Sequence, residues 1–352
     1  MRHILKTFLI EILTVLLLTT CFAAELKREK SPLDDLPPYI RQVTYFGERA
    51  DFSHDGKKIL FVEKTFGDAY EVELATGIIK PMTHHYYHEG YVRALYLANG
   101  DILLAGARKF DAENPIPSRK QYAELWVLKK DLSAPPAPLG EYCYEGPAVS
   151  RKNMKIAWTI GGTTPDAAFY MADIVYDNGT PKFANKKKIL DKRDLSITKY
   201  DVETQNFRPP DETELIFSAY GDEYAICEVA GLNIAAGKVV IYSKPSHHYG
   251  EPEGIFPDGK FTLVECDMHS GTGTGDIDIY KLALDGSGNT ERLTHFADYP
   301  GYKSSNPVVS DDGKYMAFQY AKKGDAAGAG RGILIFDLQM YEKMKKSGGK
   351  DK

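Results

Sequence analysis

Histidines gather in two short segments of the chain, each together with tyrosine and glutamate. The first segment reads Thr83-His84-His85-Tyr86-Tyr87-His88-Glu89-Gly90, and the second reads Ser246-His247-His248-Tyr249-Gly250-Glu251-Pro252-Glu253-Gly254. Two further histidines, His269 and His295, lie near aspartates. Imidazole and carboxylate groups that converge on one site can hold a divalent metal, exchange protons with a substrate, or bind a sugar beside aromatic rings. These residues are therefore the first candidates for a functional site.

The candidate ligand-binding residues are His84, His85, His88, Glu89, His247, His248, Glu251, Glu253, His269 and His295. Those suited to a metal are His84, His88, His247 and His248. No HExxH or similarly close ligand spacing accompanies them, so the pattern fixes no cofactor, and a divalent metal is the one cofactor that these side chains would suit. The alternative interpretation is that they are solvated loop residues inherited with an internal repeat.

Composition limits the class of protein. The 352 residues, with 43% hydrophobic and 26% charged side chains, suit an ordinary globular chain of about two domains or one closed β architecture. The 44 basic and 49 acidic side chains give a net charge of −5, so no broad basic surface is available for DNA or RNA. The 31 glycines, 23 tyrosines and 16 phenylalanines favour strands joined by tight turns, which predicts an all-β fold.

Residues 1–23 have the pattern of an export signal. Arg2 and Lys6 precede a mostly apolar run over 8–18, and the alanines that follow suit cleavage. The uncharged stretch is too short and too polar for a membrane-spanning helix. Because Cys21 ends a segment that resembles a bacterial lipobox, lipidation at this cysteine is an alternative that would attach the protein to a membrane. We expect a periplasmic or secreted protein, with a lipoprotein as the alternative.

Three cysteines, Cys143, Cys227 and Cys266, remain after removal of such a signal. Their odd number and the lack of CxxC spacing argue against a disulfide framework or a structural zinc site. We interpret them as small buried side chains.

One short pattern recurs in three close copies, SHDGKKILF from Ser53, FPDGKFTL from Phe256 and SDDGKYMAF from Ser310. Each reads as a strand, a turn in which glycine takes a positive φ and aspartate bonds the backbone, and a second strand. Weaker copies fill the gaps, and the equivalent turn positions 56, 100, 153, 212, 259 and 313 lie 44 to 59 residues apart. That period is typical of a four-stranded propeller blade.

A third strand is predicted after each hairpin, over residues 70–74, 125–128, 169–172, 224–227, 279–282 and 333–336. The last unit runs into a charged tail, residues 341–352, and lacks a fourth strand. The segment Arg41–Phe46 would complete that blade and leave no long sheet edge exposed. The sequence therefore predicts a six-bladed β-propeller over 39–340, closed by an N-terminal strand and preceded by a linker over 24–38.

The three close copies resemble the repeat of TolB-type propellers, and the resemblance covers roughly residues 39–338. It implies a six-bladed fold and an exported protein. TolB itself carries an α/β domain before its propeller, whereas only a short charged linker precedes residue 39 here, so we expect a TolB-like repeat protein rather than TolB. No GxSxG segment suggests a hydrolase domain.

In such a propeller, the loops between second and third strands and the loops between blades open on one face around the central channel. Seven histidines fall on this channel face: His84, His85, His88, His247, His248, His269 and His295. His54 falls in a hairpin turn on the opposite face. The long insertion 109–120 and the glycine-rich segments 267–276 and 326–332 also rim the channel face, where binding residues often lie.

Two functions remain open from these patterns, beside a purely structural role as a stable spacer in a larger surface assembly. The first is binding of an envelope protein or a glycan through the channel face, without chemistry. The second is a metal-assisted lyase or hydrolase acting on a carbohydrate or related small molecule, similar to oligogalacturonate lyases in placing histidines around a propeller channel. Nucleic acid is not an expected partner, and membrane attachment is expected only if Cys21 is lipidated.

Overall fold

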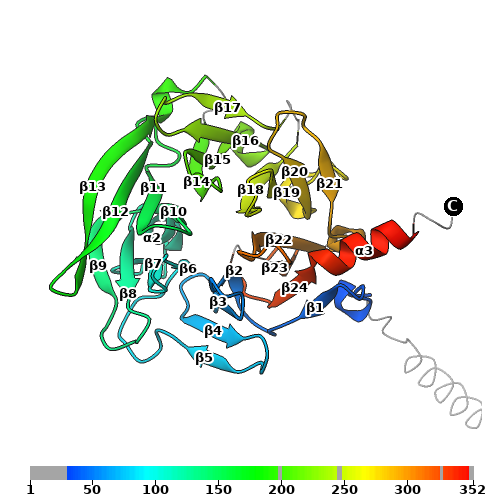
Figure 1. Cartoon of the computed structure of the whole chain (residues 1–352), viewed down its shortest axis with the longest axis horizontal. Coiled ribbons are helices and arrows are strands. Elements are labelled where there is room, and N and C mark those ends of the chain that lie inside the picture. Colours follow the sequence, from blue (N-terminus) through cyan, green and yellow to red (C-terminus); the bar gives the residue numbers. More distant parts are fainter. Residues whose placement is uncertain (1–29, 197–199, 244–247, 326–327, 349–352) are drawn as a thin grey trace, which may run out of the picture.

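The computed structural model describes residues 30–196, 200–243, 248–325 and 328–348. Its strands form six four-stranded antiparallel sheets arranged as the blades of a ring around a central channel (Figure 1). The predicted six-bladed β-propeller is confirmed. The predicted export signal 1–23, Cys21 and the first six residues of the predicted linker lie outside the described residues.

Five blades are each built from four consecutive strands, and the sixth takes its outer strand from the N-terminal end of the propeller. In each blade the first of the consecutive strands lies nearest the channel (Figure 1). Blade 1 contains β2 (Glu48–Phe52), β3 (Lys58–Val62), β4 (Ala69–Glu73) and β5 (Ile79–Pro81). Blade 2 contains β6 (Arg93–Tyr96), β7 (Ile102–Ala107), β8 (Ala123–Leu128) and β9 (Ala137–Tyr142). Blade 3 contains β10 (Tyr144–Val149), β11 (Lys155–Ile160), β12 (Ala168–Asp177) and β13 (Thr180–Asp191).

Blade 4 contains β14 (Asp201–Phe207), β15 (Glu214–Gly221), β16 (Ile226–Asn233) and β17 (Val239–Ile241). Blade 5 contains β18 (Gly250–Ile255), β19 (Phe261–Cys266), β20 (Asp278–Ala283) and β21 (Thr290–Arg292). Blade 6 contains β22 (Tyr302–Val309), β23 (Tyr315–Lys322), β24 (Ile333–Asp337) and, as its outer strand, β1 (Ile40–Gln42).

Helices are few and lie outside the sheets. They are α2 (Pro115–Lys120), α3 (Leu338–Gly348) and the short 3-10 turns η1 (Pro32–Asp34), η2 (Lys192–Asp194), η3 (Asp222–Tyr224), η4 (Gly273–Gly275) and η5 (Phe296–Asp298). None of the helices in the described ranges is both long enough and apolar enough to span a bilayer.

The hairpin turns have the conformation that the repeat predicts. Gly56, Gly259 and Gly313 all have positive φ, between 66° and 69°. In the first of these turns the Gly56 N–H donates to the Ser53 carbonyl at 2.8 Å, and the other two turns are closed by equivalent bonds. Since only glycine adopts this conformation without strain, the Asp-Gly pair marks where each hairpin reverses.

The ring closes between the two ends of the propeller. Strand β1 pairs antiparallel with β24, with Ile40 opposite Phe336 and Gln42 opposite Leu334. Closure by an N-terminal strand is confirmed, but the strand is shorter than the predicted Arg41–Phe46. After Gln42 the chain turns towards β2, and the Thr44 hydroxyl accepts the Ile333 N–H at 3.0 Å.

The predicted third strand of blade 4 was misplaced. Residues 222–224 form η3, and the strand is β16, because β15 runs to Gly221 and pairs with β16 from Gly221 opposite Ile226 to Glu214 opposite Asn233. Residues 341–348 of the expected charged tail continue α3. The Tyr341 ring contacts Tyr39 and Phe336, so this helix packs on blade 6. The three cysteines outside the predicted signal are free and buried, as the sequence predicts.

The first prediction concerns the closing strand. Ile40 is 7% exposed and belongs to the core cluster of blade 6, whereas Ile78 is 64% exposed. We expect Ile40→Ala to lower the free energy of unfolding by about 2 to 4 kcal/mol, because it removes buried methylene groups from the closure. Ile78→Ala, the matched control, should change it by less than about 0.5 kcal/mol. Urea denaturation measures both, and equal effects would contradict the closure as a source of stability.

Candidate functional site

A cavity of about 720 Å³ opens on the channel face of the ring. All six innermost strands contribute to its walls, as do loops between second and third strands. The long insertion 109–120 reaches the cavity through α2, which brings Arg119 and Lys120 into its wall. Segment 328–330 and Thr274 line it from the two glycine-rich loops.

Bulges in the innermost strands aim side chains into this cavity. Arg49 in β2, Glu145 in β10 and Asn306 in β22 all have positive φ, of 55°, 57° and 47°, at points where the strand register shifts. All three residues line the cavity. A non-glycine residue in this conformation costs on the order of 1 kcal/mol or more, and bulges often redirect side chains at functional sites. The same device in three blades marks this cavity as the candidate site.

One side of the cavity carries carboxyl groups from blades 4 and 5. Glu203 in β14, Glu251 in β18 and Glu265 in β19 line it. Two tyrosine hydroxyls, from Tyr220 and Tyr249, donate to the two oxygens of the Glu251 carboxyl. The Tyr220 hydroxyl also lies 3.4 Å from Glu203 Oε2, so a single phenol bridges two carboxyl groups.

The shared environment of these carboxyls changes their pKa values. Burial, and next the charge of Glu253, raise the pKa of Glu251 to about 7. Burial and the neighbouring glutamates also raise the pKa values of Glu203 and Glu265. Carboxyl groups with raised pKa values retain protons near neutral pH and can then donate them.

A second polar network lies beside the carboxyl groups. The hydroxyls of Tyr144 and Tyr224 both donate to Asp201 Oδ2, and the Lys120 ammonium donates to the Tyr224 hydroxyl at 2.9 Å. Burial raises the pKa of Asp201, although the two phenols and Lys120 oppose this effect. The network joins blades 2, 3 and 4 at the cavity wall, and it presents tyrosine rings and hydroxyls to a ligand.

The other side of the cavity is basic. Arg49 comes from blade 1, and Arg93 and Arg119 come from blade 2. The Arg119 Nε donates to Glu145 Oε2 at 2.6 Å, and the Lys120 ammonium lies 3.5 Å from the same carboxylate. Burial would raise the pKa of Glu145, but the charges of Arg119, Arg49 and Lys120 outweigh it and lower this pKa. Glu145 is therefore ionised within a basic surrounding.

A second cavity, of about 360 Å³, lies towards the opposite end of the channel, where hairpin turns contribute to its lining, and it shares Arg93 and Glu253 with the first. Arg93 Nη1 lies 4.0 Å from Glu253 Oε2, so a pair from opposite blades bridges the channel between the two cavities. Arg151, which lines the deeper cavity, donates to Asp311 Oδ1 and to the Phe52 carbonyl, each at 2.8 Å. These contacts join blades 3, 6 and 1 across the channel.

The histidines of the first predicted segment lie outside the lining of the channel-face cavity. His88 accepts the Gly90 N–H at Nδ1, at 2.9 Å, so its Nε2 carries the proton and donates to Asp68 Oδ1 at 2.7 Å. His84 Nδ1 lies 3.0 Å from the other oxygen of Asp68, the His85 ring packs at a tilt against Tyr86, and Glu89 accepts a bond from Tyr87. Because both ring nitrogens of His88 are engaged, neither is available to a metal in this arrangement.

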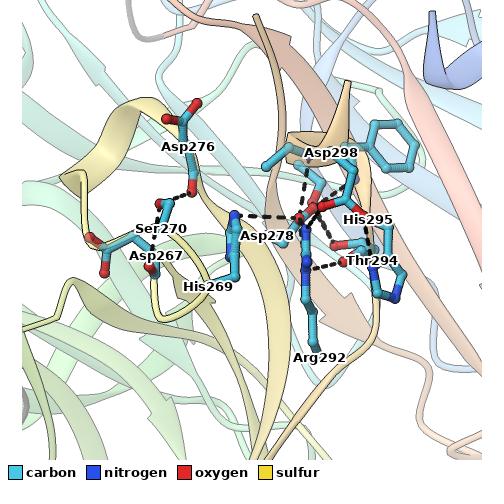
Figure 2. A network of polar contacts seen from close by, with 12 residues as sticks. Asp267, His269, Ser270, Asp276, Asp278, Arg292, Thr294, His295 and Asp298 are labelled. Atoms are coloured by element: carbon cyan, nitrogen blue, oxygen red, sulfur yellow. Dashed lines mark hydrogen bonds and ion pairs between the residues drawn. The ribbon is translucent and has the colours of Figure 1, made fainter. Parts of the chain in front are cut away.

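His269 and His295 lie among the loops of blades 5 and 6 (Figure 2). The buried Asp278 accepts bonds from Arg292 Nη2 at 2.6 Å and from the Thr294 hydroxyl at 2.9 Å. His269 Nε2 lies 4.0 Å from Asp278, and His295 Nδ1 lies 3.3 Å from Asp298. This network holds the edge of blade 5 against the loop that leads into blade 6.

His248 Nδ1 lies 3.5 Å from Asp267 Oδ1, and neither side chain lines the cavity. His247 lies outside the described residues, so its predicted role stays a prediction. Within the described ranges, no group of three or more histidine, cysteine, aspartate or glutamate side chains is arranged to hold a metal. Of the predicted ligand-binding residues that the structure describes, Glu251 and Glu253 line the cavity.

Sequence reasoning missed most of the cavity wall. The arginines of β2 and β6 and the tyrosines beside Asp201 were not proposed as site residues. A usable signal exists in the repeat. The innermost strands of a propeller are otherwise buried, yet each carries a charged residue near its start: Arg49, Arg93, Glu145, Asp201, Glu251 and Lys303. Charged residues at equivalent buried positions indicate a polar channel.

Comparison with known proteins supports the fold. No protein-family model matches the chain, and no curated protein matches its sequence. A solved oligogalacturonate lyase from Vibrio parahaemolyticus is similar over 84% of this chain and 80% of its own, with 12% identity and a TM-score of 0.50. Identity at this level shows a shared propeller and leaves the activity open.

Two other solved structures are similar at lower scores. TolB from Acinetobacter baumannii matches over 85% of this chain and 67% of its own, with 16% identity and a TM-score of 0.43. The β-propeller domain of the Trilobed protease from Pyrococcus furiosus matches over 82% of this chain and 78% of its own, with 10% identity and a TM-score of 0.48. The six-bladed propeller that the TolB-type repeats imply is confirmed by the six sheets.

The second prediction concerns the buried carboxyl groups. Because the pKa of Glu251 is about 7 in the folded chain and near 4.5 when unfolded, the folded state binds more protons between these values. The free energy of unfolding should therefore fall as the pH rises from about 4.5 to above 7. Glu251→Gln should flatten this slope. The free energy of unfolding of the variant minus that of wild type should increase by on the order of 2 kcal/mol between pH 4.5 and pH 8.

Urea denaturation between pH 4.5 and 8.5 measures this dependence. Glu113→Gln, at an exposed position in the insertion 109–120, is the matched control and should follow the wild-type curve. Parallel curves for Glu251→Gln and wild type would show that Glu251 ionises as it does in the unfolded chain.

Proposed function

We propose that this chain binds a short glycan in the channel-face cavity. The observation that carries the proposal is the cavity itself: a concave site of about 720 Å³ whose polar groups come from all six blades. Its volume lies in the range of small-molecule sites, which combine aromatic walls with a few placed polar groups. A flat protein partner would contact the rim of the ring, whereas the charged and aromatic groups here lie inside it.

The wall supplies the two kinds of contact that a sugar uses. The buried rings of Tyr144, Tyr220 and Tyr249 provide aromatic surface and hydroxyls. The carboxyl groups of Glu203 and Glu265 accept hydrogen bonds from sugar hydroxyls and, when protonated, also donate them. Both glutamates are 5% exposed, so such bonds would form away from competing water.

The third prediction tests the glycan site. Isothermal titration calorimetry with a panel of neutral and acidic trisaccharides should detect at least one ligand. Ala321→Trp should abolish its binding, because Ala321 lines the cavity and the larger ring fills that space. Ala137→Trp is the matched control on β9, the outermost strand of blade 2, and should bind as wild type does.

Two results would contradict the glycan site. One is the absence of binding across the whole panel, and the other is equal binding by wild type and Ala321→Trp. Capture of the same envelope protein by wild type and Ala321→Trp, without any sugar binding, would favour a partner protein on the rim instead.

An enzymatic role for the same cavity is the second candidate, and a specific contact favours it. The Glu251 carboxyl faces the cavity between two phenols and has a pKa of about 7, which suits a general acid. In hydrolysis of a glycosidic bond, protonated Glu251 would give its proton to the leaving oxygen. Water would supply the hydroxyl to the anomeric carbon and return its other proton to Glu251.

The fourth prediction separates this enzyme from a binding protein. If the cavity hydrolyses its glycan, Glu251→Gln should lower kcat by about 10² to 10⁴, and Glu113→Gln should leave it unchanged. The wild-type rate should decline as the pH rises through about 7, because the general acid loses its proton there. Release of reducing ends from the bound trisaccharide measures this rate. Binding without turnover in wild type would exclude the hydrolase and leave the binding function in place.

A further inference from the structure

Three guanidinium groups meet on the basic side of the channel-face cavity. Arg49, Arg93 and Arg119 all line it. Burial, followed by the positive charges of Arg119 and Arg93, lowers the pKa of Arg49 to about 10. The three groups are therefore close enough to repel one another in a region of reduced dielectric constant.

The protein supplies few partners for two of these arginines. Arg49 is 5% exposed and donates from Nη1 to the Val92 carbonyl at 2.9 Å. Its Nε is buried without a hydrogen-bond partner, 3.8 Å from Glu48 Oε1. A guanidinium has five N–H donors, and a buried donor that remains unpaired costs about 1 to 3 kcal/mol.

Arg93 has still fewer partners. Its guanidinium donates no hydrogen bond to any residue in the part of the chain that the structure describes, and its nearest carboxylate oxygen, on Glu253, is 4.0 Å away. Glu253 is itself held by the Asn306 amide, which donates to Oε1 at 2.8 Å. The side chain of Arg93 is 13% exposed, and that exposure is towards the cavities it lines. Its donors therefore face the space where a ligand would lie.

Packing holds Arg93 in place although hydrogen bonds do not. Gly146 lies beside it in β10, and a Cβ atom at this position would lie 2.7 Å from Arg93 Nε. The absence of a side chain at Gly146 thus creates the room that the guanidinium occupies. The Arg93 guanidinium is thus held in position by packing and retains free N–H donors. Such a group is pre-organised to bind an anion.

We propose that the glycan bound in this cavity carries a carboxylate, as a uronic acid unit does, and that this carboxylate docks on Arg93 beside Arg49. The proposal rests on the proposed glycan-binding function. The planar guanidinium matches the two oxygens of a carboxylate in a bidentate arrangement. The charges of Glu253, Glu203 and Glu145 already raise the pKa of Arg93 against the effect of burial, so the added negative charge would chiefly relieve the repulsion that Arg119 and Arg93 exert on Arg49. Arg119 is already paired with Glu145 through Nε, and it adds positive charge to this side of the cavity.

The experiment compares matched acidic and neutral sugars by isothermal titration calorimetry. The probes are the trisaccharides of D-glucuronate, D-galacturonate and D-mannuronate, with the trisaccharides of D-glucose, D-galactose and D-mannose as neutral counterparts. At least one uronate should bind 10-fold or more tightly than its neutral counterpart. Its affinity should fall as salt is added, because the contact is between charges.

Three variants assign the contact to Arg93. Arg93→Lys keeps a positive charge opposite Glu253 but removes the planar guanidinium that would bind both carboxylate oxygens. It should lower uronate affinity about 10-fold while neutral sugars bind as before. Gly146→Ala keeps Arg93 itself but moves its guanidinium, so it should have a similar effect. Arg108→Met removes a charge from an exposed arginine that does not line this cavity, and it should leave the affinity unchanged. The melting temperature of each variant checks that it is folded.

The outcomes separate this proposal from the function on which it rests. Equal binding of uronates and neutral sugars would overturn the carboxylate site and leave the glycan-binding function in place. Binding of D-glucose 6-sulfate without binding of any uronate would show a sulfate site instead. Uronate binding that Arg93→Lys and Gly146→Ala leave unchanged would place the carboxylate elsewhere. No binding of any sugar would overturn both the carboxylate and the proposed function.

Discussion

The structure depends on the pairing of charged side chains that line the central channel. A charge buried without a partner is strongly destabilising, so a charged residue on an innermost strand needs a counter-charge within reach or, if it is a carboxyl group, a bound proton. Arg93 faces Glu253 across the ring, and Arg151 contacts Asp311 from the opposite blade. These pairs join blades far apart in sequence, so the polar contents of the channel stabilise the same ring that the sheets and the closing strand β1 form.

On the channel face, some charged side chains lack a counter-charge or a hydrogen-bond partner within the protein. These side chains form the candidate site. The carboxyl group of Glu251 is surrounded by other glutamates and tyrosines, so it is kept partly protonated rather than neutralised by a base. Arg93 and Arg49 retain donors that the protein does not use. One wall of the cavity is therefore rich in hydrogen-bond acceptors and protonated carboxyl groups. The opposite wall is rich in basic hydrogen-bond donors. A ligand with hydroxyls and one negative charge would satisfy both walls.

The sequence predicted the architecture well because the repeat is local. An Asp-Gly turn between two apolar strands has the same conformation wherever it occurs, so three copies were enough to establish the blade. The histidines show the limit of this reasoning. The repeat places them in loops of one face, but it does not state their distance from the channel axis. In the structure His88 and His269 lie beside acidic residues, Asp68 and Asp278, in the loops around the cavity rather than in its lining.

By itself the sequence determined the ring of six blades, its closure by an N-terminal strand, and the loops that share the channel face. Each follows from turn chemistry or from the need to cover a sheet edge, which neighbouring residues dictate. Only the tertiary structure decided which side chains meet in the channel. Bulges at Arg49 and Glu145 rotate those side chains in a way that strand alternation does not predict. The pair of Arg93 and Glu253 forms only when the closed ring sets blades 2 and 5 opposite each other, where Arg93 Nη1 lies 4.0 Å from Glu253 Oε2.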